Sequence, residues 1–160
     1  MILSDDPSFK NTMNYTISLE NFQKVLIHLL NNKSSATQQF DYDIATLRYK
    51  IGEIYFKMEK YEQALDQFKK VVGIYLNVFP LTLSNLARNY DAITDTSILI
   101  LQNYLFEHEY YFRFIPLRYS LLAATYRYMA SIYFLEPKHI ETALSIYKLA
   151  TAIESIQQDY

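Results

Sequence analysis

The residue types that most often carry catalysis or bind phosphate are scarce in this chain. It has no cysteine, three histidines and only two glycines, Gly52 and Gly73. The lack of cysteine excludes disulfides, thiol nucleophiles and Cys-ligated zinc. Two glycines so far apart cannot form a G-x-G-x-x-G or G-x-x-x-x-G-K phosphate-binding loop.

The acidic residues near the histidines lack the spacing of a metal site. Glu136 and His139 match the Glu-x-x-His of di-iron bundles, but that site needs a second such motif and two more glutamates. Glu107, His108 and Glu109 are consecutive, so on a helix they point about 100° apart. We therefore expect no metal, no cofactor and no enzymatic activity. A Ser-His-Asp arrangement assembled only by the fold stays an alternative.

Residues 107–127 interleave aromatic rings with arginines. This stretch offers a candidate aromatic interface made of Tyr110, Tyr111, Arg113 and Arg118. Alternating arginines and rings can stack nucleic-acid bases. Tyrosine and arginine are also enriched at protein interfaces, and rings can instead fill a core while arginine heads reach solvent. We favour a core or a protein interface over RNA binding.

The composition is that of a folded domain of ordinary charge. The 160 residues are 51% hydrophobic, 16% aromatic and 20% charged, with a net charge of −2. Such a chain corresponds to about one domain and can bury a core. The near-neutral charge argues against nucleic-acid binding through a strongly basic surface.

The N-terminal residues do not resemble a secretory signal. Asp5 and Asp6 stand where a basic start and an apolar run would be needed. No segment reaches about 18 uninterrupted apolar residues, so we expect no membrane span. These features favour a cytoplasmic location, with the nucleus as an alternative.

Apolar residues recur at steps of three and four over most of the chain, which predicts helices. Residues 1–17 are expected to form a loose lead-in, and Ser18 is expected to cap the first helix. The helices are predicted over about 18–30, 41–58, 61–79 and 116–135, and from 137 onward. The sequence does not divide residues 81–114 clearly. No segment alternates like a strand, so the predicted fold class is all-α.

The pattern that begins at Ala45 resembles the tetratricopeptide repeat, a 34-residue pair of antiparallel helices. Positions eight, eleven, twenty and twenty-four of that repeat hold Gly52, Tyr55, Ala64 and Phe68. Small residues at positions eight and twenty allow the helices to approach closely. This copy departs from the family at positions four and twenty-seven, which hold Arg48 and Val71.

Two further copies of the pattern follow. The second, carried by Ala87 and Tyr90 on its first helix, is degenerate on its second helix and longer than the family period. The third copy is clearer, and its matching residues are Ala130, Tyr133, Ala143, Tyr147 and Ala150.

The resemblance covers about residues 41–155 and implies a right-handed solenoid of about three tetratricopeptide-like units after an extra N-terminal helix. Residues 18–160 are then one domain, and a generic helical bundle is the alternative.

The family's groove positions are Thr46, Tyr49, Glu53 and Phe56 in the first copy and Ala124, Arg127, Ser131 and Phe134 in the third. Members that bind chaperone C-terminal carboxylates need Lys and Asn where this chain has Tyr49 and Glu53. The resemblance therefore implies an apolar or mixed-charge peptide, with an ordinary solvated face as the alternative.

The predicted function is a non-enzymatic protein–protein interaction module, an adaptor or scaffold subunit of a larger assembly. It would bind a partner peptide or helix in its groove or by its aromatic face. A peptide-sensing regulator domain and a chaperone for a secreted or assembly client stay alternatives.

With 16 tyrosines and 10 phenylalanines, the chain has more rings than three helix pairs easily bury. We therefore expect an exposed apolar patch that meets a partner or a second copy, as in a homodimer or an obligate complex.

Overall fold

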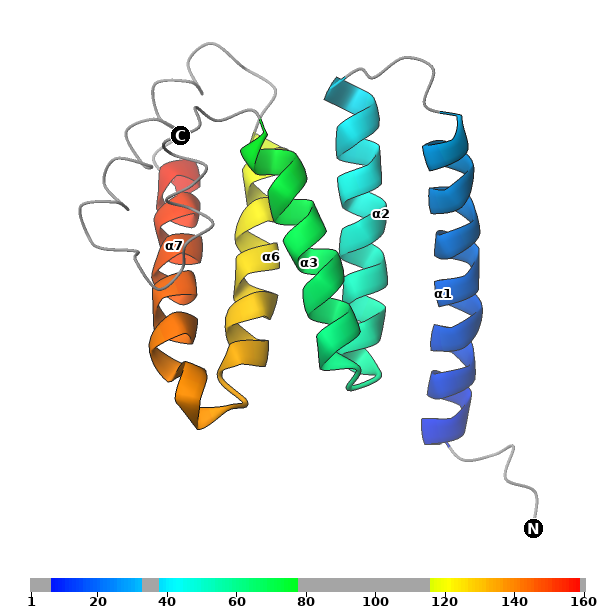
Figure 1. Cartoon of the computed structure of the whole chain (residues 1–160), viewed down its shortest axis with the longest axis horizontal. Helices are drawn as coiled ribbons and strands as arrows, with labels where there is room; N and C mark the ends of the chain where they lie inside the picture. The colour runs from blue at the N-terminus through cyan, green and yellow to red at the C-terminus, as the bar shows by residue number, and fades with distance from the viewer. Residues whose placement is uncertain (1–6, 33–37, 78–115, 159–160) are drawn as a thin grey trace. The chain divides into compact units, whose positions relative to one another are not determined.

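The computed structural model describes residues 7–32, 38–77 and 116–158, and every regular element in these ranges is helical (Figure 1). They contain five α-helices and one short 3-10 helix, and no strand. The all-α prediction is confirmed. The chain divides into two compact units, Met1–Lys70 and Val71–Tyr160, which are described separately below.

Helix α1 spans Pro7–Asn31 and therefore begins eleven residues before the predicted cap at Ser18. The expected loose lead-in over 1–17 is wrong for residues 7–17. The physical reason is that Pro7 occupies the first helical position, where its missing N–H is not needed. The Thr16 hydroxyl donates to the Thr12 carbonyl at 3.0 Å, which satisfies a polar side chain within the helix.

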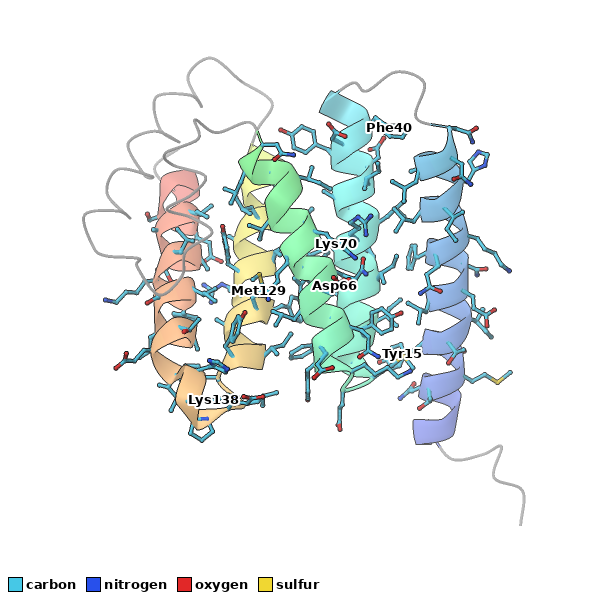
Figure 2. The ribbon with its side chains drawn as sticks, in the orientation of Figure 1. Tyr15, Phe40, Asp66, Lys70, Met129 and Lys138 are labelled. Atoms are coloured by element: carbon cyan, nitrogen blue, oxygen red, sulfur yellow. The ribbon has the colours of Figure 1, made fainter. Side chains whose placement is uncertain are left out.

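Helix α1 packs against α2, which spans Gln38–Lys57. Leu26 is buried on α1, and Gln23 Nε2 donates to the Tyr55 hydroxyl of α2 at 3.1 Å. The Lys57 ammonium lies 6.0 Å from the centre of the Tyr15 ring, which Figure 2 labels on α1. The predicted extra N-terminal helix is thus present and joined to the first hairpin.

A tight turn connects α2 to α3, which spans Tyr61–Leu76. Glu59 has a φ of 59°, in the left-handed region. The Lys60 N–H donates to the Tyr55 carbonyl at 2.9 Å, and the Glu59 N–H donates to the Phe56 carbonyl at 3.0 Å. This pair of bonds is the Schellman motif that ends many helices. The predicted boundary between the two helices is confirmed, although α3 ends three residues before the predicted Phe79.

The α2–α3 hairpin is closely packed around Gly52. A Cβ atom at Gly52 would lie 2.6 Å from Cε1 of Phe68, which is itself fully buried. Ala64 on α3 is also fully buried. Helix α2 can therefore approach α3 this closely only because position 52 has no side chain.

The second unit contains a hairpin of α6, Pro116–Tyr133, and α7, Ile140–Gln158, which run antiparallel (Figure 1). The 3-10 helix η3, Pro137–His139, lies between them and includes Lys138, which Figure 2 labels at the turn end of the hairpin. Glu136 is extended, as expected before a proline. The two predicted helices are confirmed. Pro137 opens the 3-10 helix η3 rather than the α-helix itself, and α7 begins three residues later, at Ile140.

The core of this hairpin consists of aliphatic, small and aromatic side chains from both helices. Its buried members include Leu122, Tyr126, Met129, Ala130, Ala143, Ile146, Leu149, Ala150 and Ile153. Thr125 is the one polar residue buried among the described residues, and its hydroxyl donates to the Leu121 carbonyl at 2.7 Å. A satisfied hydroxyl is compatible with an apolar core.

The degenerate middle copy, including Ala87 and Tyr90, lies outside the described residues. The described helices form two hairpins, which is consistent with paired helices. The tetratricopeptide-like repeat, its right-handed solenoid and the single domain over 18–160 stay predictions.

Candidate functional site

The first set of predicted groove residues lies along α2. Tyr49 is only 8% exposed, and its ring centre is 6.1 Å from that of Phe68 on α3. It therefore contributes to the hairpin core rather than to an open surface. Tyr49 lies one helical turn before Gly52 and shares its face, which explains why both meet Phe68.

Glu53 and Phe56 are more accessible than Tyr49, and both have neighbours within the hairpin. The Glu53 carboxylate accepts a hydrogen bond from Lys50 Nζ at 2.9 Å, and the same ammonium lies 5.5 Å from the centre of the Tyr49 ring. Phe56 is half-buried and makes an edge contact with Tyr61, with ring centres 5.5 Å apart. This end of α2 presents a balanced charge pair beside an aromatic ring. Lys50 offsets part of the repulsion that Glu53 alone would exert on an acidic ligand.

Arg48, which replaces the apolar residue usual at position four, has polar partners on α3. Its Nη1 donates to Gln67 Oε1 at 3.2 Å. Partial burial lowers the pKa of Arg48, and the nearby Asp66 carboxylate opposes this shift. Asp66 also pairs with Lys70 at 2.6 Å, one turn along α3 (Figure 2). The departure from the family pattern is therefore accommodated by a polar contact between the two helices.

In the second hairpin, Arg127 of α6 is held by two side chains of α7. Its Nε donates to Glu154 Oε1 at 2.6 Å, and its Nη2 contacts Glu154 Oε2. Its Nη1 donates to the Tyr147 hydroxyl at 3.1 Å, with the guanidinium 5.0 Å from the centre of that ring. A guanidinium that binds one carboxylate through two nitrogens has little freedom left for a ligand.

The pKa values of this cluster reflect the same contacts. The hydrogen bond from Arg127 lowers the pKa of Glu154, although some burial opposes the shift. The pKa of Arg127 is raised, first by its bond to Glu154 and then by its bond to Tyr147. Both groups are charged at neutral pH, so the pair joins α6 to α7 under physiological conditions.

Ser131 and Phe134 complete the predicted groove set in this hairpin. The exposed Ser131 hydroxyl donates to the Arg127 carbonyl at 3.0 Å. Phe134, just after the end of α6, is 52% exposed. Phe56 and Phe134 occupy the same position in their copies of the pattern, and each follows a tyrosine. Among the predicted groove residues, Phe134 is the large apolar side chain that is most accessible.

The predicted aromatic interface lies largely outside the described residues. This applies to Tyr110, Tyr111 and Arg113. Arg118 lies in the first turn of α6, and its side chain also falls outside the description.

The Glu-x-x-His motif forms a small polar cluster at the turn of the second hairpin. Glu136 Oε2 lies 3.0 Å from Lys138 Nζ and 3.6 Å from His139 Nε2. The hydrogen bond from Lys138 lowers the pKa of Glu136. The His139 ring makes an edge contact with Tyr133 at 5.6 Å. In the described ranges, no three His, Cys, Asp or Glu side chains gather closely enough to hold a metal ion.

Two features of the surface were not predicted at residue level. Glu154 and Tyr147 act as the partners of Arg127, and their only signal in the sequence is a seven-residue spacing on α7. Helix α1 also exposes large apolar side chains on its outer side, among them Met13, Ile17 and Ile27. Their spacing resembles that of a buried stripe, so the pattern alone does not show that they face solvent.

None of the helices in the described part of the chain is long and apolar enough to cross a membrane. Comparisons of the chain with protein-family models, with curated proteins and with solved structures gave no match.

Proposed function

We propose that this protein is a non-enzymatic protein–protein interaction module, an adaptor or scaffold subunit built from tetratricopeptide-like helix pairs. The observation that carries the proposal is the shared placement of Phe56 and Phe134. Each ring lies near the end of the first helix of its pair, beside the turn, and each keeps accessible surface. Exposed aromatic residues are the usual anchors of protein interfaces.

The packing of the two hairpins supports the same proposal. Small residues of the pattern are buried where the helices meet, namely Gly52 and Ala64 in one hairpin and Ala130 and Ala143 in the other. Small residues at these positions allow the two helices of a pair to pack closely. This is the arrangement on which tetratricopeptide-like modules depend for binding.

The charges beside the two rings indicate the class of partner. Near Phe56, the Lys50–Glu53 pair offers one charge of each sign. Near Phe134, Arg127 is bound by Glu154 and the exposed Glu136 is paired with Lys138, so the charges beside this ring also balance. A partner segment with one or two large apolar anchors and no strong net charge fits both surfaces.

A selection from a random peptide library on the immobilised full chain tests this proposal. We expect enriched peptides with apolar anchors, and a measured Kd about tenfold or more weaker for Phe134→Ser and Phe56→Ser. Lys138→Ala is a matched control, because its exposed side chain lies at the turn but carries no anchor. The proposal would be overturned if no peptide were enriched, or if both serine variants bound the selected peptides as tightly as the wild-type chain does.

The same binding assay separates the two alternatives. Tight binding of a free peptide of about five to ten residues favours a peptide-sensing domain. Binding only of a long client segment, with no affinity for short fragments, favours a chaperone.

A further inference from the structure

Helix α1 has an apolar face on the side away from α2. Leu26 is buried and Gln23 donates to a hydroxyl of α2, so these two residues mark the covered side. On the other side of α1, the large apolar side chains of Met13, Ile17 and Ile27 are 57%, 48% and 57% exposed. The outer face of a surface helix is usually polar, so this face is suited to contact with another helix.

The exposed face has the spacing of a helix–helix seam. Six exposed residues recur along it at alternating steps of four and three, and we call them the α1 seam: Met13, Ile17, Glu20, Lys24, Ile27 and Asn31. On a helix these positions stay within about 40° of one line. This is the spacing at which one straight helix contacts a second helix along its length.

The two charged residues at the centre of the α1 seam select the partner. Glu20 and Lys24 are exposed, and in the described part of the chain neither side chain has an ion pair or a hydrogen bond. We propose that α1 pairs with α1 of a second copy of this chain, in antiparallel orientation. A two-fold axis beside position 22 places Glu20 of each copy opposite Lys24 of the other. Both unpaired charges of each copy are then neutralised by the other copy.

The same register also pairs the apolar groups of the α1 seam. It places Ile17 opposite Ile27 of the second copy and Met13 opposite its Asn31, because these pairs are also symmetric about position 22. A surface whose pattern is complementary to its own reverse is suited to an isologous contact with itself. A parallel pair would instead place glutamate opposite glutamate and lysine opposite lysine, which is repulsive. The charges therefore select the orientation as well as the partner.

The residues beside the α1 seam do not oppose this pairing. None of them is Asp, Glu, Lys or Arg: one edge carries Asn14, Asn21 and His28, and the other carries Thr16, Gln23 and Leu30. The central glutamate and lysine therefore meet no competing acidic side chain and no competing Lys or Arg along the seam. Leu30 is 40% exposed and adds apolar area at the rim.

The area of the surface sets the expected affinity. The apolar residues of the α1 seam and the stems of its charged residues bury about 400 Å² per copy. A total of about 800 Å² corresponds to a weak and reversible association. We therefore expect a Kd of about 10–300 μM. The pairing does not rest on the proposed peptide binding, whose anchors Phe56 and Phe134 lie outside α1.

Sedimentation analysis of the full chain, from about 1 μM to 1 mM, tests the pairing. The mass should rise from 19.0 kDa toward twice that value as the concentration increases. Glu20→Lys and Lys24→Glu should each weaken association about tenfold, because each replaces two attractions by two repulsions. The double variant with both changes should restore the affinity to within about threefold, and Lys69→Glu at an exposed position of α3 is the charge-matched control.

A second pair of variants tests the apolar part of the α1 seam. Ile17 and Val25 are both 48% exposed on α1, but only Ile17 belongs to the seam. Ile17→Ser should weaken association about fivefold or more, whereas Val25→Ser should leave it unchanged. Circular dichroism checks that each variant keeps its helices.

Cross-linking with a short bismaleimide tests the orientation. The chain has no cysteine, so Asn21→Cys and Asn14→Cys each give a single reactive site, and both positions are exposed on the same edge of the α1 seam. Along the helix axis of the antiparallel dimer, the two cysteines at position 21 are about 3 Å apart and those at position 14 are about 24 Å apart. Only Asn21→Cys should therefore form a covalent dimer efficiently.

Three results would contradict the pairing. A chain that stays monomeric at the highest concentration would show that a second copy does not cover this face. A dimer that keeps its affinity in Glu20→Lys, Lys24→Glu and Ile17→Ser would show that the contact lies elsewhere. Equal cross-linking of the two cysteine variants would show that the helices are not antiparallel in this register.

Discussion

Alanine at Gly52 should destabilise the α2–α3 hairpin, whereas alanine at Gly73 should stabilise α3. Both glycines lie inside helices, so both replacements gain about 1 kcal/mol of helix propensity. At Gly73 a new Cβ meets nothing within 4 Å. At Gly52 the new Cβ meets three atoms of the Phe68 ring, at 2.6, 3.0 and 3.0 Å. Both substitutions therefore gain the same helix propensity, but only the one at Gly52 introduces a steric clash.

The magnitude follows from how little the Phe68 ring can move. The ring is fully buried, and Tyr49 packs beside it. Overpacking at such a site costs about 1–3 kcal/mol, which exceeds or cancels the gain in propensity. Gly52→Ala should thus lower the free energy of unfolding by about 0–2 kcal/mol, and Gly73→Ala should raise it by about 1 kcal/mol. For a chain of this size the two melting temperatures should differ by about 3–10 °C.

Urea unfolding followed by circular dichroism measures both free energies. A third variant, Gly52→Ala with Phe68→Leu, tests the cause, because a smaller side chain at position 68 relieves the clash. Its stability should exceed the sum of the two single effects. A Gly52→Ala variant as stable as Gly73→Ala, or a double variant whose stability is the sum of the two single effects, would show that the new Cβ does not clash with Phe68.

The remaining predictions concern the turn and the ion pair. Glu59→Gly should stabilise the chain by about 0.5–1 kcal/mol, because glycine adopts the left-handed turn without strain. By contrast, Glu62→Gly inside α3 should destabilise it by about 1 kcal/mol. Urea unfolding compares the two variants, and equal effects on stability would contradict the strain at position 59. A double-mutant cycle of Arg127→Ala and Glu154→Ala should give a coupling of about 0.5–1 kcal/mol, since both side chains are partly exposed, and zero coupling would show that the pair is not formed. Because the folded-state pKa of Glu154 is lowered, the stability that its charged form contributes is present above its ordinary pKa of 4.5 and is lost as the pH falls through the lower folded value. The free energy of unfolding of Glu154→Gln should therefore fall less steeply below about pH 4.5 than that of the wild type. The same dependence on acidic pH in both chains would contradict the shift.

The helices of the described regions were largely predictable, because their signals are local. The three-and-four spacing of apolar residues and the turn at Glu59–Lys60 placed α2 and α3 within a few residues of their observed ends. The start of α1 was missed because polar residues before Ser18 resemble a loop when no packing face is apparent. Pro7 is a good first residue of a helix, and the structure uses it as one.

The surroundings of the candidate site residues were less predictable, because they depend on contacts between helices. Position five of the pattern was expected to face the groove, but Tyr49 packs on Phe68 since Gly52 leaves room on that side. The binding of Arg127 by Tyr147 and Glu154 joins residues 20 and 27 positions apart in the chain. No local periodicity specifies such a pairing; it appears only once α6 and α7 are docked.

The proposed function requires that the accessible aromatic ends of the helix pairs bind a partner segment. Titration calorimetry of a library-selected peptide against the wild-type chain, Phe56→Ser and Phe134→Ser tests it most directly. Leu144→Glu, at an exposed position within α7, serves as the control. We expect the two phenylalanine variants to bind the peptide about tenfold or more weakly and the Leu144 variant to bind it like the wild type. Undiminished binding by both phenylalanine variants would contradict it.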